Sequence, residues 1–133
     1  MKKITLPLTT LVFSLTMMFA STSYAEWTEV SEGVDGDTYY VDFERIRKHG
    51  GYVYFWYLID YLKPQHGDLS AKTYNQGDCK LFRFKGLSDS YHTQSMGEGT
   101  PSTTSNTPDK DWKYPPPDSA IEHILKKVCK TAN

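Results

Sequence analysis

The sequence contains only two cysteines among its 133 residues, Cys79 and Cys129, and they do not form a Cys-X-X-Cys pair. A redox-active or nucleophilic cysteine is therefore not indicated. The four histidines lie in separate segments, at His49, His66, His92 and His123. Neither a His-Glu-x-x-His nor a Gly-x-Ser-x-Gly motif occurs, which argues against a metalloprotease or a serine hydrolase. We expect a protein that is not an enzyme, without a cofactor or a metal site.

Carboxylates in apolar surroundings are also scarce. Asp42 and Asp60 are the two that adjoin strongly apolar stretches. A pair so far apart in sequence gives no acid–base motif. We expect each to end a strand or to pair with a basic residue.

Long apolar runs are limited to one, from Ile4 to about Ala20, and it is interrupted by threonines and serines. Lys2 and Lys3 precede this run, and Ser23-Tyr24-Ala25 follows it with small residues at the positions that a signal peptidase reads. We interpret residues 1–25 as a signal peptide rather than a membrane anchor, so the mature chain begins at Glu26. No cysteine near this site offers a lipid attachment point. The protein is expected to be exported, to the periplasm or outside the cell.

A strong excess of one charge is missing too. Lys and Arg number 15 against 16 Asp and Glu, and loss of Lys2 and Lys3 with the leader brings the formal charge to about −3. This balance excludes a general binder of nucleic acid or of acidic membranes. Residues 26–133 are of the length expected for one domain.

Export makes a disulfide between Cys79 and Cys129 the expected state of the two thiols. Near the C-terminus, Ser119 and Glu122 match a capping box. Apolar residues then recur at helical spacing, at Ile121, Ile124, Leu125, Val128 and Cys129. This stripe predicts a helix whose apolar face, including Cys129, covers one face of a sheet.

The remaining pattern predicts antiparallel strands. A hairpin is expected from residues 26–32 and 38–42 around the GVDGD turn. A long strand follows at 52–62, ended by a loop at 63–68 that contains Pro64. Two further strands, 69–75 and 79–86, are expected to meet at a Gly77-Asp78 turn, with an edge strand around Tyr91.

The stretch YVYFWYLIDYL, residues 52–62, is apolar or aromatic at nearly every position. One helix covers one face of a strand, so the second face needs a curled sheet, a partner or a second copy of the chain. Either alternate set of side chains could face the helix. Our hypothesis is that the uncovered face forms a homodimer, because of its aromatic content.

Residues 95–111 are rich in Gly, Pro, Ser and Thr. Such a composition buries too little apolar surface to offset the entropy of ordering, so we expect a mobile loop. Its role is either that of a spacer or that of a binding element.

Basic residues cluster in two places. The stretch FERIRKHGG, residues 43–51, carries Arg45, Arg47 and Lys48 before a Gly-Gly turn, which is either a solvated turn or part of a binding surface. In CKLFRFKG, residues 79–86, alternation places a lysine beside two aromatic side chains, which are Lys80, Phe82 and Phe84. The other face carries two residues directed at the helix and two basic residues near the strand end, which are Cys79, Leu81, Arg83 and Lys85. This strand is either an ordinary half-buried one or a protein-binding surface.

Taken in order, YYVDFERIRKHGGYVYFWYLIDY, GDLSAKTYNQGDC and PPPDSAIEHILKKVC resemble the surface-adhesin protein E family of Gram-negative bacteria. The shared features are Asp42 after the tyrosine pair, Asp60-Tyr61, Ser70, the Asp78-Cys79 pair and the C-terminal helix with its cysteine. They span almost the whole mature chain.

The resemblance implies an α+β fold, an antiparallel sheet of about six strands with a C-terminal helix packed on one face and tied by the Cys79–Cys129 disulfide. It also implies a tendency to dimerise and the binding of host matrix or serum proteins such as vitronectin, laminin and plasminogen. Lys80, Arg83 and Lys85 occupy places comparable to the binding positions of the family. The alternative function is that of a periplasmic accessory or inhibitor protein with a partner in the bacterial envelope, which the missing lipid-attachment cysteine favours.

Overall fold

The computed structural model describes residues 25–133, so residues 1–24 of the expected signal peptide lie outside the described part. The described chain forms seven strands, two short 3-10 helices and one α-helix. In chain order these are β1 (Thr28–Glu32), β2 (Thr38–Val41), η1 (Phe43–Arg45), β3 (Arg47–His49), β4 (Tyr52–Gln65), β5 (Asp68–Asp78), β6 (Arg83–His92), η2 (Ser95–Gly97), β7 (Thr103–Ser105) and α1 (Ala120–Ala132). No helix within residues 25–133 has the length and apolar character needed to cross a membrane.

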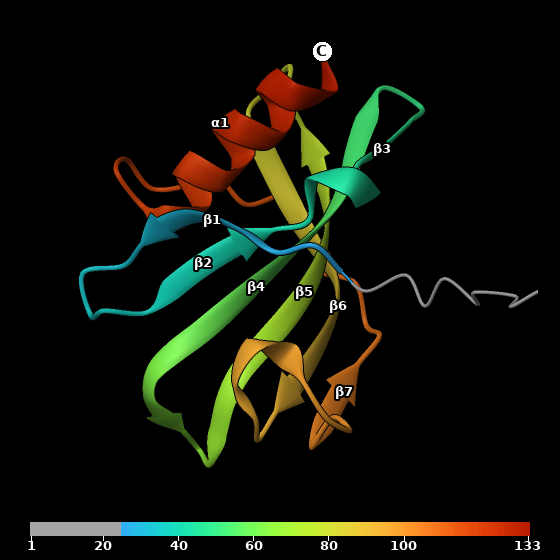
Figure 1. The fold of residues 1–133 in the computed structure, drawn as a ribbon. Helices are drawn as coiled ribbons and strands as arrows, with labels where there is room; N and C mark the ends of the chain where they lie inside the picture. The colour runs from blue at the N-terminus through green and yellow to red at the C-terminus, as the bar shows by residue number, and fades with distance from the viewer. Residues whose placement is uncertain (1–24) are drawn as a thin grey trace, which may run out of the picture.

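All the strands join one antiparallel sheet with the order β1-β2-β4-β5-β6-β7. The short strand β3 pairs with the first three residues of β4, and β2 pairs with residues 57–60 of the same strand. Figure 1 shows the long strands β4, β5 and β6 running side by side, with α1 against one end of the sheet. The predicted α+β architecture is confirmed, including the hairpin of residues 28–41.

The core lies between α1 and one face of β2 and β4. Val53 and Phe55 of β4 are 5% and 0% exposed, and Val41 of β2 is 0% exposed. They meet the buried stripe of α1, which consists of Ile124, Leu125 and Val128. Burying aliphatic and aromatic side chains in this way contributes about 1.5–3 kcal/mol each. The helix therefore selects Val53 and Phe55, and leaves Tyr52, Tyr54 and Trp56 on the other face.

The helix begins where the capping box predicts. The Ser119 hydroxyl accepts a hydrogen bond from the Glu122 backbone N–H at 3.2 Å, and the Glu122 carboxylate accepts one from the Asp118 N–H at 3.3 Å. One of the donors that a helix start leaves unpaired, the Glu122 N–H, is thus satisfied, and the Glu122 carboxylate holds the residue before the cap rather than the cap itself. The far end of α1 is tied to the residue after β5 by the Cys79–Cys129 disulfide, with a Cα–Cα distance of 5.6 Å.

The second face of β4 is partly covered by the turn η2. Leu58 is fully buried there, and a Cβ on Gly97 would lie only 3.0 Å from its Cδ1 atom. Gly97 also has a φ of +66°, so glycine is required twice over. Asp60 and Ser70 fix the turn, because the Asp60 carboxylate accepts from the Met96 N–H at 2.8 Å and the Ser70 hydroxyl accepts from the Gly97 N–H at 2.8 Å.

Two predicted turns are misplaced. Strand β4 continues through Pro64 to Gln65, and the hairpin closes at His66 and Gly67, whose φ values of 51° and 85° are those of a two-residue primed turn. The register shifts between Asp60 and Gln65, so the missing N–H of Pro64 falls in an irregular part of the ladder. A loop at 63–68 was therefore the wrong prediction.

Gly77 and Asp78 do not form a turn either. Strand β5 runs through both, and the chain reverses over residues 79–82, where Phe82 has a φ of 52°. Gly77 lies in the strand because core side chains fill the space above it: an added Cβ would be 2.8 Å from Val53 and 3.1 Å from Leu125.

The expected edge strand around Tyr91 is the continuation of β6. Within residues 95–111 the chain forms η2 and β7, and the mobility of this segment stays a prediction.

Candidate binding face

The face of the sheet opposite α1 gathers aromatic and cationic side chains. Cross-strand pairing sets Tyr54 against Gln76, Trp56 against Tyr74 and Gln76 against Lys85, so these side chains share one face. Pairing of Arg47 with Tyr54 adds β3 to it. We call this the open face, and it consists of Arg47, Tyr52, Tyr54, Trp56, Tyr74, Gln76, Arg83, Lys85 and Trp112.

Three aromatic rings form the middle of the open face. Trp56 stacks on Tyr74 with ring centroids 4.9 Å apart, and Tyr54 lies 6.2 Å from Tyr74. The Gln76 side-chain amide donates to the Tyr54 hydroxyl at 3.3 Å. Burial and the neighbouring Tyr54 raise the pKa of the Tyr74 phenol, and the charge of Arg47 opposes this rise. The rings are held by one another and present a partly exposed aromatic surface.

Trp112 brings the segment between β7 and α1 onto the same face. The backbones of Lys113 and Phe84 exchange two hydrogen bonds of 2.9 Å, which fixes the chain beside β6. The Trp112 ring then lies 5.4 Å from that of Tyr52, 4.4 Å from the Arg83 guanidinium carbon and 4.7 Å from the Lys85 ammonium nitrogen. Cation–π contacts of this kind hold both positive charges at the surface.

Arg83 has a second partner beneath it. Its Nε lies 2.9 Å from the Asp78 Oδ2, while Asp78 Oδ1 accepts from the N–H groups of Lys80 and Leu81 at 3.2 Å each. Burial alone would raise the pKa of the Asp78 carboxyl, but the hydrogen bonds from Arg83, Leu81 and Lys80 outweigh burial and lower it. Asp78 therefore closes the turn after β5 and aligns Arg83 toward Trp112.

At the other end of the open face lies an open hollow of about 770 Å³. Arg45 and Arg47 line it together with Trp56 and Tyr74. Arg45 reaches the buried Asp42, whose Oδ2 lies 3.3 Å from the Arg45 Nε. Asp42 thus pairs with a basic residue as expected, and Asp60 instead holds η2.

The structure separates the basic and aromatic residues that the sequence grouped. Arg47, Arg83 and Lys85 share the open face, and Arg45 borders it. Lys80 is exposed in the turn after β5, Lys48 is exposed on β3, and Leu81 is 53% exposed instead of facing the helix. Phe82 packs against the core, and Phe84 alternates with Arg83 and Lys85, so neither stands beside Lys80. The reason is that the strand begins at Arg83 and the preceding four residues turn.

Trp112 is the residue that sequence reasoning missed. It lies in a segment without periodicity, so no local pattern indicates where its ring goes. One signal was available in the sequence. Trp112 directly follows a stretch rich in Pro, Ser and Thr, and so large an apolar side chain in a polar segment needs a surface to pack on.

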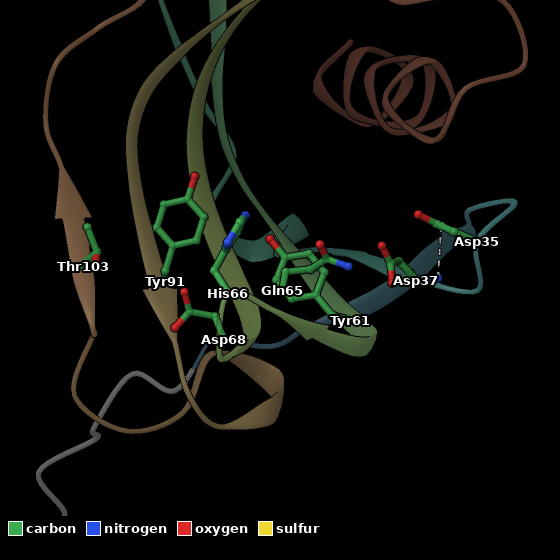
Figure 2. A pocket seen from close by; sticks show the side chains of 8 residues that line it. All are labelled: Asp35, Asp37, Tyr61, Gln65, His66, Asp68, Tyr91 and Thr103. Carbon is green, nitrogen blue, oxygen red and sulfur yellow. Dashed lines mark hydrogen bonds between the residues drawn. The ribbon is translucent and has the colours of Figure 1, made fainter.

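A second hollow of about 500 Å³ lies near the β4–β5 turn and includes acidic and aromatic side chains (Figure 2). Asp37 accepts from the Leu62 N–H at 3.0 Å, and Asp68 accepts from the Ser102 hydroxyl at 2.6 Å. These two carboxylates therefore anchor neighbouring segments. The carboxylate of Glu122, at the start of α1, also has structural partners. It accepts from the Asp118 N–H and forms an ion pair with Lys126 at 3.2 Å.

Comparison with known proteins agrees with the fold. The model of the family Surface-adhesin protein E matches residues 27–130. Crystal form II of Haemophilus influenzae protein E is 16% identical with a TM-score of 0.62, covering 80% of this chain and 89% of that chain. The selenomethionine form of the same protein is 15% identical with a TM-score of 0.60, covering 80% of this chain and 88% of that chain. No curated protein matches this sequence.

The structural likeness, at this identity, concerns the fold: an antiparallel sheet with one helix. The family match concerns the sequence, and it extends from the residue before β1 to within α1. It thus includes every strand and the disulfide described above. This chain belongs to the surface-adhesin protein E family.

Proposed function

We propose that the exported chain is a non-enzymatic binding protein that attaches to host matrix or serum proteins through its open face. Membership of an adhesin family supports the class of function. The observation that carries the proposal is the joining of Arg83, Lys85, Trp112 and Tyr52 into one surface cluster. Tryptophan, tyrosine and arginine are the residues that most often dominate the binding energy of protein interfaces.

Charge and aromatic surface have separate roles in this proposal. The cations attract an acidic partner toward the open face. This attraction weakens as the salt concentration rises, since the Debye length falls from about 10 Å at 0.1 M to about 3 Å at 1 M. The stacked pair Trp56 and Tyr74 offers apolar area that salt does not screen. Binding should therefore lose part of its affinity in high salt and retain the rest.

The test measures binding of oxidised mature protein, residues 26–133, to immobilised vitronectin, laminin and plasminogen at both salt concentrations. The double variant Arg47→Gln/Lys85→Gln removes two open-face charges, and Arg83 is kept because it compensates the buried Asp78. We expect about a tenfold rise in Kd, which corresponds to about 1.4 kcal/mol. The matched control Lys63→Gln/Lys127→Gln removes two exposed charges elsewhere and should bind like the parent protein.

A Trp56→Ala variant separates the two contributions. It should weaken binding at both salt concentrations, whereas the charge variant should differ from the parent mainly at 0.1 M. If the parent binds one of the three proteins and both open-face variants bind it equally well, the open face is not the binding site. Absence of binding to all three proteins would favour the alternative, a partner within the bacterial envelope.

A further inference from the structure

Asp42 is a buried carboxylate whose hydrogen-bonding capacity is unused. It is 1% exposed, and within residues 25–133 neither of its carboxylate oxygens accepts a hydrogen bond. The Arg45 Nε lies 3.3 Å from Oδ2, which is an ion pair without hydrogen-bond geometry. An ionised carboxylate removed from water normally has several donors around it, because its desolvation is costly. The site therefore fits an additional cationic donor.

The start of the mature chain lies beside this carboxylate. Pairing of Thr28 with Val41 brings residues 26 and 27 alongside Asp42. Glu26 and Asp42 both line the hollow of about 770 Å³ at the end of the open face. Ala25, Trp27 and Asp42 line the smaller hollow next to it, of about 120 Å³.

Removal of the leader changes the chemistry at this place. While the chain continues through Ala25, the nitrogen of Glu26 is an amide with one N–H. Cleavage after Ala25, the site expected from Ser23-Tyr24-Ala25, makes it an ammonium with three donors and a positive charge, since an α-amino group has a pKa of about 7.7–8.0. We propose that the Asp42 carboxylate binds the amino-terminal ammonium of Glu26 that signal-peptide removal creates.

The charges around the site agree with this occupant. The larger hollow carries the carboxylates of Glu26, Asp42 and Glu44 against the guanidinium groups of Arg45 and Arg47. One negative charge is in excess there, and the new ammonium neutralises it. Lys72 lines the smaller hollow and is the competing ammonium. Processing then ties the start of β1 beside Trp56, at the border of the open face. This inference does not depend on which partner the open face binds.

The experiment compares two mature proteins secreted from the full chain. One has the native junction, and the other has Gly-Ser inserted between Ala25 and Glu26, which moves the amino group two residues away. Each is made with Asp42 and with Asp42→Asn, and the amino terminus is established by mass spectrometry. We expect the insertion to lower Tm by about 4 °C with Asp42 present, as the loss of one ion pair would in a domain of this size, and to leave Tm unchanged with Asp42→Asn.

Two further measurements keep the test decisive if Asp42→Asn does not fold. Acetylation of the amino terminus at neutral pH should be slower in the native protein than in the inserted one, because an ion-paired ammonium gives up its proton less readily. Lys72→Met should leave this difference intact. The proposal is overturned if the insertion changes neither Tm nor acetylation, if Lys72→Met abolishes the difference, or if the mature chain does not begin at Glu26.

Discussion

At the scale of the residue, Asp42 and Asp78 show how differently two buried carboxylates can be stabilised. Asp78 is 5% exposed and has three donors, which are the side chain of Arg83 and the N–H groups of Lys80 and Leu81. These donors favour its ionised form, and its pKa is lowered despite burial. The Asp42 carboxylate, within residues 25–133, has the ion pair with Arg45 and accepts no hydrogen bond. Local backbone donors make the difference.

The lowered pKa of Asp78 predicts a specific acid sensitivity. Because the folded-state pKa lies below the unfolded value of about 3.9, the unfolded chain binds the extra proton first. The stabilisation is present above about pH 4 and is lost as pH falls through the folded-state pKa. Urea unfolding should be measured between about pH 2.5 and about pH 7. The free energy of unfolding should fall less steeply with decreasing pH for Asp78→Asn than for the parent. A control at exposed Asp111, Asp111→Asn, should keep the parental pH profile.

Gly77 is required for a different reason, because the core occupies the position of its missing side chain. An added Cβ would lie 2.8 Å from Val53 Cγ2, 3.1 Å from Leu125 Cδ1 and 3.2 Å from Phe55 Cε1. Gly77→Ala should therefore lower the free energy of unfolding by about 1–3 kcal/mol, measured by urea denaturation. Combining it with Leu125→Val, which removes a methylene nearby, should cost less than the sum of the two changes. Simple additivity would show that overpacking is not the cause.

At the scale of the element, α1 is attached to the sheet in two ways. Its apolar stripe packs against β2 and β4, and its last turns are tied to the end of β5 by a disulfide closing a sequence separation of 50. The disulfide restricts the unfolded chain, whereas the stripe stabilises the folded one. The two contributions add in a domain with so small a core.

Replacing both cysteines by alanine should lower the free energy of unfolding by about 2–5 kcal/mol. Guanidinium denaturation of Cys79→Ala/Cys129→Ala, and of the parent in reductant, should give similar midpoints. Circular dichroism under native conditions should still show α1, because the helix keeps its cap and its buried stripe. A midpoint equal to that of the oxidised parent would contradict the predicted contribution.

The turn η2 depends on one hydroxyl for its attachment to β5. Ser70 is fully buried, donates to the Gln94 carbonyl at 2.6 Å and accepts from the Gly97 N–H at 2.8 Å. Ser70→Ala leaves both backbone groups unpaired and should cost about 1–3 kcal/mol. Hydrogen exchange at the Gly97 amide should accelerate more than exchange in β4. The exposed Ser105→Ala should have neither effect, and unaltered exchange at Gly97 in Ser70→Ala would refute the role of the hydroxyl.

At the scale of the whole molecule, the two faces of the sheet are covered to different extents. Among residues 25–133, one face carries α1, while the opposite face carries η2 over Leu58 and Trp112 over Arg83 and Lys85. The aromatic surface between these two covers consists of Tyr54, Trp56 and Tyr74. A surface of this kind suits contact with another protein.

The hypothesis of a homodimer through the open face remains a prediction and can be tested directly. Sedimentation equilibrium of residues 26–133 up to high micromolar concentration should show a monomer–dimer equilibrium. Tyr54→Lys should shift it toward the monomer, because it sets like charges against each other across a two-fold interface. The control change Val34→Lys, at a fully exposed residue in the turn between β1 and β2, should leave it unchanged. A strictly monomeric parent protein would refute the hypothesis.

Much of the fold could be predicted because it depends on local patterns. The first hairpin follows from its turn residues, and α1 follows from its capping box and apolar spacing. The turn at Gly77 was wrong because glycine was interpreted as a chain reversal, whereas it serves a close approach of Val53 and Leu125 from distant segments. The grouping of Lys80 with Phe82 and Phe84 failed because it assumed a strand beginning at Cys79, and that strand begins four residues later.

The sequence by itself determined the family, the helix and the pairing of two cysteines, because each depends on residue type and spacing along the chain. The export signal stays a prediction of the same kind. Only the tertiary structure decided which side chains of β4 face α1, since both alternate sets are apolar. It also placed Trp112 over Arg83 and Lys85, a contact across more than twenty-five positions that no periodicity encodes. The physical reason is that binding surfaces arise from residues joined by packing and strand register, and these are properties of the folded chain.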